Sequence, residues 1–283
     1  MPSLTTPCHQ QPVRPLTERE FDNISRLAYE KFGLELKGGK RELVSARLSK
    51  KVRALGCPSF QAYYQHVLED RTGEALIELI DALTTNFTGF MREPSHFEFL
   101  RREALSGWLA RDRVRIWSTA CSTGEEPYTL AFSLLDVLGG AKRPRLQIVA
   151  TDISSRALQE AQRAVYPAAR LESLPPGWLR TFFLKGERQW KGSYRVKPEI
   201  TSMIEFRRLN LIEPFSHPEP MSAILCRNVM IYFDKATQQT LVQRLASQLE
   251  PGGYLLIGHS ESLTGIDHPL TYVRPTIYRR GRA

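Results

Sequence analysis

The stretch VRIWSTACSTGEEPY, residues 114–128, constrains the fold more than any other part of the sequence. Residues 114–118 are mostly β-branched and aromatic, which predicts a short strand. The small residues at 119–124 predict a tight turn, and from Glu125 onward apolar residues recur at helical spacing. A strand, a small-residue turn and a helix form the first unit of a nucleotide-binding α/β sheet. Ligands of such sheets bind at the carboxyl ends of the strands.

The predicted turn lacks the features of a phosphate-binding loop. Gly124 is its only glycine, so the G-x-G-x-x-G spacing is absent, and Glu125 and Glu126 follow directly. These carboxylates would repel a pyrophosphate and attract a cation or a sugar hydroxyl. S-adenosylmethionine fits this chemistry, because it carries a sulfonium, an ammonium and a ribose but no phosphate. The alternative is that both acids only favour a helix N-terminus.

The N-terminal part of the chain, to about residue 90, has the pattern of a small all-helical domain. Residues 1–15 contain four prolines and predict a flexible tail. A capping box at residues 17–20 starts a helix that ends near Gly33. Further helices are expected at about 39–55, 60–68 and 74–83.

The second of these helices is strongly basic. Residues 37–53 hold seven basic side chains and one acidic side chain. Such a face either docks an acidic partner or is simply solvated. The basic residues that we single out are Lys40, Arg47, Lys50, Lys51 and Arg53.

Beyond residue 113 the sequence alternates strand and helix patterns, as in a doubly wound α/β sheet. A polar and aromatic segment at about 187–196 predicts an inserted hairpin, and Pro251-Gly252-Gly253 separates the last predicted helix from the following strand. Strands are further expected at 146–151, 203–209, 223–227, 254–259, 270–273 and 276–279, and helices at 125–138, 154–165, 176–184 and 235–249.

These patterns divide the chain into consecutive parts. We expect a tail at 1–15, a helical domain at 16–83, a linker at 84–98, and an α/β domain at 99–283 with an insert at about 185–200. The linker mixes polar groups with aromatic residues, and Arg92 is the only cation in the run 83–94. The linker either forms a lid over the cofactor or only connects the two domains.

Composition narrows the class of protein further. The net charge of +9 suits an acidic partner, without choosing among nucleic acid, a membrane surface and an acidic protein. The four cysteines show no metal-ligand or redox spacing, and the six histidines offer no convincing catalytic or metal-binding set. The sequence has neither a signal-peptide pattern nor a membrane-spanning window, so we expect a cytoplasmic protein.

Polar residues follow several of the predicted strands. Asp152 ends the strand at 146–151 and either accepts hydrogen bonds from a ribose or caps the next helix. Asn210 either contacts an adenine edge or ends its strand as a turn residue. Arg227 and Asn228 follow a buried strand and indicate a site rather than a surface loop. Tyr232 lies four residues beyond Asn228 and either faces the same side or only packs.

Five motifs together resemble one family closely. They are ALTTNFTGFMRE (82–93), STACSTGEEPYTLA (118–131), ATDIS (150–154), NLIEPF (210–215) and CRNVMIYFD (226–234). The chain is similar, from about residue 17 to 280, to the CheR family of chemotaxis-receptor protein-glutamate O-methyltransferases. This resemblance implies an all-helical N-terminal domain and a Rossmann-like S-adenosylmethionine domain that carries a small β-subdomain.

The resemblance also implies roles for single residues. Tyr232 resembles the aromatic residue near the transferred methyl group, and Arg92 matches a linker contact to the cofactor. We predict that Arg92 and Tyr232 together orient the incoming carboxylate. The other implied cofactor contacts are Asn86, Thr88, Gly124, Glu126, Asp152, Asn210, Leu211, Arg227 and Asn228. The visible departure from the family pattern is Cys121, where a small residue such as alanine is usual.

The implied activity is methylation of receptor glutamates to methyl esters, with release of S-adenosylhomocysteine, as part of chemotactic adaptation. A glutamate is already ionised at pH 7, so neither a general base nor a metal is needed. The basic helix would dock the receptor's acidic helical bundle, and the β-subdomain could hold a C-terminal pentapeptide tether. We expect a cytoplasmic monomer that is recruited to receptor arrays without inserting into the membrane.

Two other classes of protein fit the sequence less well. A nucleic-acid methyltransferase would share the fold and the charge, but it usually carries an Asn/Asp-Pro-Pro-Tyr-like run where this chain has residues 227–230, RNVM. A binding module that only senses S-adenosylmethionine would be expected to lose Arg92 or Tyr232, and both are present. We therefore expect an enzyme that does not bind nucleic acid.

Overall fold

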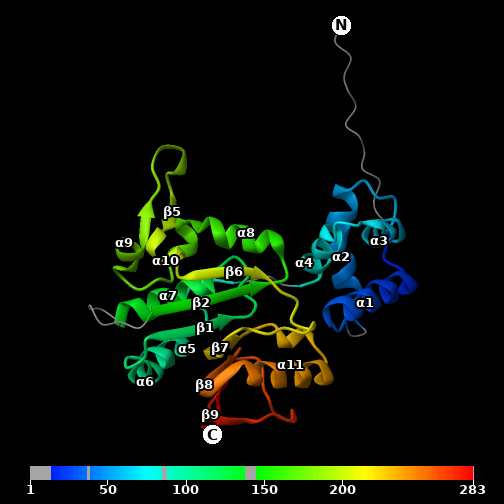
Figure 1. Cartoon of the computed structure of the whole chain (residues 1–283). Coiled ribbons are helices and arrows are strands. Elements are labelled where there is room, and N and C mark those ends of the chain that lie inside the picture. Colours follow the sequence, from blue (N-terminus) through cyan, green and yellow to red (C-terminus); the bar gives the residue numbers. More distant parts are fainter. Residues whose placement is uncertain (1–13, 37–38, 85–87, 138–144, 283) are drawn as a thin grey trace. The chain divides into compact units, whose positions relative to one another are not determined.

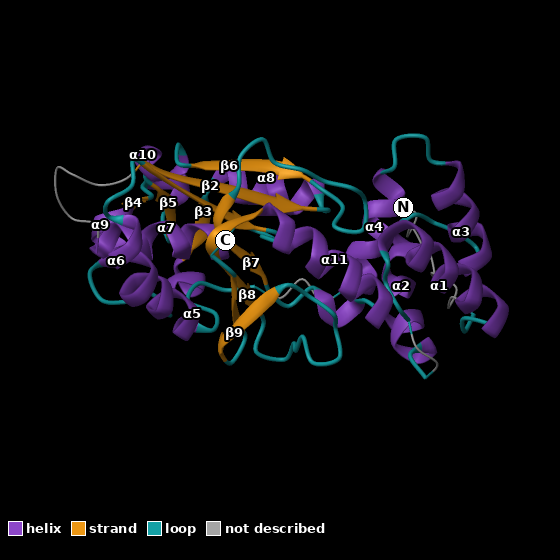
Figure 2. Ribbon diagram, turned by 60° about the horizontal axis from the view of Figure 1, so that its bottom comes forward, coloured by secondary structure: helices purple, strands orange, loops and turns teal. Residues whose placement is uncertain are grey.

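The computed structural model describes residues 14–36, 39–84, 88–137 and 145–282 (Figure 1). The chain divides into two compact units, residues 1–85 and 86–283. Figure 2 shows that the described part of the first unit is helical, whereas the strands belong to the second unit. The expected tail at 1–15 lies almost wholly outside the described residues. Among the described residues, no helix is both long and apolar enough to cross a membrane.

The first unit contains α1 (Glu18–Phe32), α2 (Arg41–Ala54), α3 (Phe60–Glu69) and α4 (Glu74–Leu83). The capping box is confirmed, since the Thr17 hydroxyl accepts from the Glu20 N–H and the Glu20 carboxylate accepts from the Thr17 N–H. Gly33 ends α1 with φ of 68°, a conformation that favours glycine. Apolar side chains from all four helices form the core of this unit.

Two of the basic residues singled out from the sequence have partners on α4. Arg47 donates a hydrogen bond to the Leu83 carbonyl at the end of α4, and Lys51 pairs with Glu78 at 2.8 Å. Lys40, Lys50 and Arg53 are exposed. The basic face predicted from the sequence therefore has two parts, one packed against α4 and one open to solvent.

The second unit is built on a seven-stranded sheet of order β6-β2-β1-β7-β8-β10-β9. β6, β2, β1, β7 and β8 are parallel to one another, and β10 runs antiparallel to both of its neighbours, β8 and β9. The strands are β1 (Arg113–Ser118), β2 (Arg145–Asp152), β6 (Ile204–Arg208), β7 (Met221–Cys226), β8 (Leu249–Ile257), β9 (Leu270–Arg274) and β10 (Ile277–Arg280). This order confirms the predicted doubly wound sheet.

Both faces of the sheet are buried, as parallel sheets require. Side chains alternate along each strand, so Ile116 of β1 faces one hydrophobic core and Trp117 faces the other. The first core includes residues of α7 (Glu125–Val137), α8 (Ser155–Arg163) and α9 (Trp178–Phe182). The second core is closed by α11 (Lys235–Gln248).

A second, antiparallel sheet has the order β3-β5-β4 and consists of β3 (Val165–Pro167), β4 (Phe183–Lys185) and β5 (Ser193–Val196). Its first strand lies well upstream of the insert expected at about 185–200. The hairpin expected at 187–196 is confirmed as β4 paired with β5, but it begins earlier, at Phe183, because residues 188–190 form a 3₁₀ turn, and β3 adds a third strand beside β5. A short helix, α10 (Pro198–Thr201), follows β5.

Three other elements differ from the sequence prediction. Residues 94–108 form α5 (Pro94–Phe99), a π-helical turn (Leu100–Ala104) and α6 (Leu105–Trp108), where no element was expected. Pro251-Gly252-Gly253 does not separate α11 from the next strand but lies inside β8, where the pairing with β7 shifts register. The predicted helix at 176–184 is shorter, because its last residues enter β4.

Candidate active site

The carboxyl ends of β1, β2, β6 and β7 meet at one edge of the sheet, because these strands are parallel. The strand order changes direction between β1 and β7, and in open α/β sheets this is where ligands bind. The candidate residues Glu126, Asp152, Asn210, Arg227 and Asn228 follow these strand ends or begin the next helix. The topology therefore brings together residues from four separate parts of the sequence.

The turn between β1 and α7 is tightly packed. Gly124 has φ of 95°, and a Cβ atom there would lie 2.8 Å from Ala161 Cβ and 2.9 Å from the Tyr166 hydroxyl. Ser122 has φ of 48° and donates its N–H to Asp152 Oδ2 at 2.8 Å. Gly124 thus fixes the shape of the turn through its backbone, as the sequence suggested.

Asp152 is half-buried at the end of β2 and connects two loops. Its carboxylate accepts the N–H groups of Ser122 at 2.8 Å and of Ser154 at 2.9 Å. Ser154, and not Asp152, is the N-cap of α8, since its hydroxyl accepts the Ala157 N–H. The capping alternative for Asp152 is therefore wrong, and a carboxylate oxygen can accept further hydrogen bonds from a ligand.

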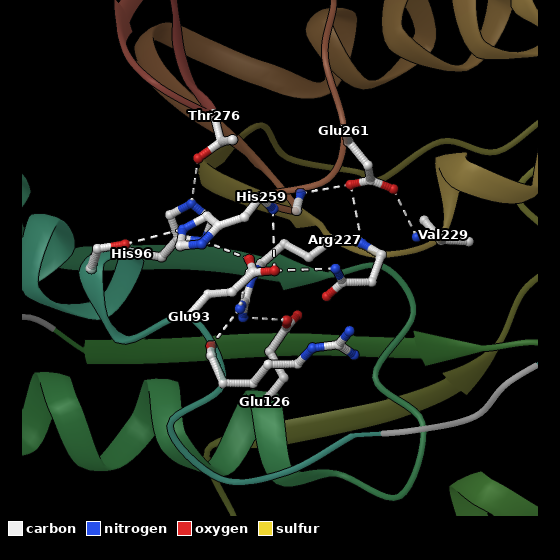
Figure 3. A network of polar contacts seen from close by, with 12 residues as sticks. Glu93, His96, Glu126, Arg227, Val229, His259, Glu261 and Thr276 are labelled. Carbon is white, nitrogen blue, oxygen red and sulfur yellow. Dashed lines mark hydrogen bonds and ion pairs between the residues drawn. The ribbon is translucent and has the colours of Figure 1, made fainter.

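Arg227 is the centre of a buried polar network (Figure 3). Its side chain is 1% exposed and donates to Glu126 Oε2 at 2.7 Å, to Glu93 Oε2 at 3.1 and 3.2 Å, and to the Arg92 carbonyl. The guanidinium also lies over the Phe97 ring at 5.4 Å. This side chain joins α7 to the linker, and its role as a cofactor contact stays a prediction.

The two carboxylates that face Arg227 differ in their titration. Burial alone would raise the pKa of Glu93, but the Arg227 guanidinium and the donors of Asn228 and His259 bring it below its ordinary value. Burial raises the pKa of Glu126, although Arg227 and the Ser118 hydroxyl oppose that rise. Glu93 is therefore the more firmly ionised partner.

A further carboxylate, Glu261, holds the loop that carries Tyr232. It accepts the backbone N–H groups of Asn228, Val229, Met230 and Ile231 at 2.8–3.3 Å, and that of Gly258 at 2.6 Å. Burial raises the pKa of Glu261, against the lowering effect of these N–H donors. The network fixes Asn228, whose φ is 58° and whose amide donates to Glu93 Oε1 at 3.1 Å.

Neither Glu93 nor Glu261 was predicted as a site residue from the sequence. Their signals were weak, since Glu93 ends a non-periodic linker and Glu261 lies in a polar loop after β8. Each acts on backbone groups that are distant in the sequence. The position of Glu261 just beyond a central parallel strand is the one feature that could have drawn attention to it.

The acids that begin α7 have separate partners. Glu125 is fully buried and pairs with Arg170 at 2.9 Å and with the Thr123 hydroxyl at 2.7 Å. Glu126 faces Arg227 and accepts the Ser118 hydroxyl at 2.7 Å. The expectation that both acids face a ligand is thus wrong for Glu125, because Arg170 neutralises it inside the protein.

Glu93, His96 and His259 bring donor atoms of metal-ligand type within 4.8 Å of one another. His96 Nε2 lies 2.8 Å from the Thr276 hydroxyl and His259 Nε2 lies 3.2 Å from the Ser95 hydroxyl. His96 Nδ1 lies 3.5 Å from Glu93 Oε2 and has no hydrogen-bond partner among the described residues. Burial, and then the nearby Arg227, lower the pKa of His96 to about 3, so this ring is neutral. We interpret the cluster as part of the polar network around Glu93.

The remaining candidate site residues lie in the linker, after β6 and in the 3₁₀ turn that follows β7. Thr88 and Arg92 are half-buried in the linker, Leu211 is buried after β6, and Tyr232 is half-buried at the end of a 3₁₀ turn (Met230–Tyr232). Asn210 donates its amide to Glu213 at 3.0 Å. Asn86 lies outside the described residues. The roles of all these residues toward a ligand stay predictions.

The two cysteines near strand ends, Cys121 and Cys226, are buried. Burial raises the pKa of both thiols, so neither is a reactive thiolate. Both cysteines are therefore packed side chains.

Comparison with known proteins identifies the family. The model of the CheR methyltransferase all-alpha domain matches residues 19–84, and that of the CheR methyltransferase SAM binding domain matches residues 86–278. Chemotaxis protein methyltransferase 2 of Pseudomonas aeruginosa is 40% identical over 263 residues, covering 93% of this chain and 93% of that protein. Chemotaxis protein methyltransferase of Salmonella typhimurium is 37% identical over 264 residues, covering 93% of this chain and 90% of that protein.

Among solved structures, the N-methyltransferase NodS from Bradyrhizobium japonicum with S-adenosyl-l-homocysteine matches with a TM-score of 0.33 and 18% identity, over 58% of this chain and 60% of that chain. This similarity is too low to support an argument. The family models match both units in order, and the curated relatives match nearly the whole chain. This chain therefore belongs to the CheR methyltransferase family, and its second unit is the S-adenosylmethionine-binding domain of that family.

Proposed function

We propose that this protein transfers a methyl group from S-adenosylmethionine to glutamate side chains of chemoreceptors, as part of chemotactic adaptation. The observation that carries the proposal is the edge of the sheet, where Asp152, Glu126 and the Arg227 network lie beside the linker with Arg92. The names of the curated relatives support the chemotactic role. The products would be glutamyl methyl esters and S-adenosylhomocysteine.

The residues at this edge fit the cofactor. Asp152 presents a half-buried carboxylate, suited to ribose hydroxyls, at the end of β2. The Ser122 hydroxyl is buried without a hydrogen-bond partner among the described residues, as expected of a group that awaits a ligand. Gly124 leaves no room for a side chain, so the turn between β1 and α7 packs directly against Ala161 and Tyr166.

The chemistry asks the protein for positioning and for exclusion of water. When bound, S-adenosylmethionine supplies an electrophilic methyl group and its own leaving group. A receptor glutamate is ionised at neutral pH and attacks without a base. Arg92 would hold one carboxylate oxygen while the other attacks, and Tyr232 would confine its approach. The Arg92 contact should be partial, since a strong ion pair would stabilise the ground state.

Receptor docking is proposed for the exposed part of the basic helix. Lys40, Lys50 and Arg53 are exposed on the first unit and could face an acidic helical bundle. Arg47 and Lys51 were part of the predicted docking surface, but their contacts with Leu83 and Glu78 support a structural role first. A solvated basic face remains the alternative.

The small antiparallel sheet is the proposed site for a C-terminal receptor tether. β3 and β4 are its outer strands, and an outer strand can pair with an extended peptide. Leu184 and Trp190 are 48% and 58% exposed on this sheet and its 3₁₀ turn, and they could receive apolar peptide side chains. We further propose that the protein is a cytoplasmic monomer recruited to receptor arrays.

The experiment that tests the function is transfer of labelled methyl from S-adenosylmethionine to receptor cytoplasmic fragments, with and without their C-termini. We expect labelling of both fragments and faster labelling of the fragment with the C-terminus. Equal rates would mean that the C-terminal tether does not contribute to methylation. No labelling of either fragment would overturn the proposed function.

A further inference from the structure

The linker residue Arg92 lies between two residues with an unfavourable backbone. Met91 has φ of 58° and Glu93 has φ of 57°, in the left-handed region that residues with a Cβ atom rarely adopt. Such conformations persist only where surrounding contacts hold them, and they gather at functional sites. Two of them on either side of one arginine indicate that the direction of this arginine matters.

The contacts that hold this backbone converge on the Glu93 carboxylate (Figure 3). Its Oε2 atom accepts from Arg227 Nη2 at 3.1 Å and Nε at 3.2 Å. Its Oε1 atom accepts from the Asn228 amide and from the His259 N–H, both at 3.1 Å. The Glu93 side chain is 11% exposed.

The same network also holds the peptide before Glu93. Arg227 Nη2 donates to the Arg92 carbonyl, and the Arg92 N–H donates to the Gly89 carbonyl at 3.3 Å. The Met91 N–H donates to the Thr129 hydroxyl of α7 at 3.2 Å. The main chain on both sides of Arg92 is therefore fixed to the sheet and to α7.

We infer that Glu93 is a positioning residue for methyl transfer: its carboxylate, held by Arg227, Asn228 and the His259 N–H, fixes the strained backbone that aims Arg92 at the substrate carboxylate. The inference rests on the role of Arg92 in the proposed function. Arg227 also pairs with Glu126, so one guanidinium fixes the position of the linker relative to the first turn of α7. Glu93 itself need not touch the cofactor or the receptor.

The test uses the full chain with Glu93→Gln, which keeps the shape and one acceptor oxygen but removes the charge. Misplacement of a catalytic group by about 1 Å can cost about 100-fold in rate, so we expect kcat to fall about 10- to 100-fold. The Kd for S-adenosylhomocysteine, measured by calorimetry, should change by less than kcat does, because the Asp152 carboxylate proposed to bind the ribose is held by the Ser122 and Ser154 N–H groups, outside the Glu93 network.

Asp136→Asn is the matched control. It removes one carboxylate from an ion pair of 2.7 Å with Arg101 in the same unit, at an exposed place on α7. Its kcat should equal that of the wild type. Thermal melting of every variant shows that it is folded. Should Glu93→Gln fail to fold, Glu93→Asp, which keeps the charge on a shorter side chain, should show the same selective loss of kcat.

Arg92→Ala and the double variant decide whether Glu93 acts through Arg92. We expect Arg92→Ala/Glu93→Gln to be no slower than Arg92→Ala, since residues that act as a unit are not additive. Additive losses would overturn the inference, as would an unchanged kcat in Glu93→Gln or an equal loss of cofactor affinity. A wild-type kcat in Arg92→Ala would instead refute the proposed role of Arg92, and the inference with it.

Discussion

At the residue scale, the buried guanidinium of Arg227 is central to the site. It faces Glu93 and Glu126, whose side chains are 11% and 13% exposed. A buried carboxylate tolerates such a place only when it is paired or hydrogen-bonded. The charge of Arg227 therefore stabilises the fold as well as the site. Its replacement should lower the free energy of unfolding, unlike replacement of a residue that only binds the cofactor.

Arg227→Met should lower the free energy of unfolding by about 3–5 kcal/mol, because it leaves two carboxylates buried without their counter-ion. Urea unfolding followed by tryptophan fluorescence measures this change. The control is Arg101→Met, which removes an exposed partner of Asp136 and should cost less than about 1 kcal/mol. Equal effects of the two substitutions would refute the central place of Arg227.

Asp152→Ala should weaken binding of S-adenosylhomocysteine about 10- to 100-fold, which corresponds to about 1.5–3 kcal/mol for a charged acceptor. Part of this loss would come from the Ser122 and Ser154 N–H groups that Asp152 accepts. Asp152→Asn, which keeps one acceptor oxygen, separates the two effects by calorimetry. An unchanged affinity in a folded Asp152→Ala protein would contradict the ribose role.

His96 should make the protein less stable in acid. Its pKa is lowered to about 3 by burial and by Arg227, with Glu93 opposing and His259 adding to the shift. Between the ordinary histidine pKa of about 6.5 and this value, the unfolded chain binds a proton that the folded chain does not, so stability falls as pH falls.

Urea unfolding between pH 7 and pH 4 tests this effect of His96. Replacement by glutamine should reduce the loss of stability over this range, whereas replacement of the exposed His66 on α3 should leave it unchanged. If wild type and His96→Gln lost stability in parallel, the lowered pKa of His96 would be refuted.

At the element scale, α2 shows what periodicity can and cannot predict. The basic and apolar faces of this helix could be predicted from residue spacing, since side chains three and four apart share a face. The roles of Arg47 and Lys51 could not, because their partners Leu83 and Glu78 come from α4 and depend on how the two helices pack.

Lys50→Glu with Arg53→Glu should raise the Michaelis constant for receptor and flatten its dependence on salt, since exposed charges are screened beyond about 8 Å at physiological ionic strength. Cofactor affinity should not change. The matched control is Arg19→Glu with Arg26→Glu, which makes the same charge change at exposed positions of α1. If both double variants methylate receptor normally at low salt, the basic face of α2 is only solvated.

The small sheet and β8 show why β3 and the start of β8 could not be predicted from the sequence. β3 is three residues long and directly follows α8, so its strand pattern is too short to stand out. Pro251-Gly252-Gly253 usually marks a turn, but here a register shift against β7 accommodates it within β8. In both cases pairing with a distant strand overrides the local signal.

At the scale of the whole molecule, the alternation of strands and helices was enough to predict the doubly wound sheet and the edge where its ligand binds. Glu126, Asp152, Arg227 and Asn228 could be placed at this edge because each follows a strand or begins a helix there. The hydrogen-bond network around Glu93 could not be predicted, because it joins a non-periodic linker to loops that only the folded sheet brings together.

The proposed activity of this chain is the conversion of receptor glutamates to methyl esters. The most direct measurement is the transfer of tritiated methyl from S-adenosylmethionine to a receptor cytoplasmic fragment, followed by mild alkali, which releases a methyl ester as methanol. We predict labelling that alkali releases and that disappears when the acidic receptor residues are replaced by alanine. A folded protein that binds S-adenosylhomocysteine but leaves the receptor unlabelled, or labels it in an alkali-stable form, would contradict the account.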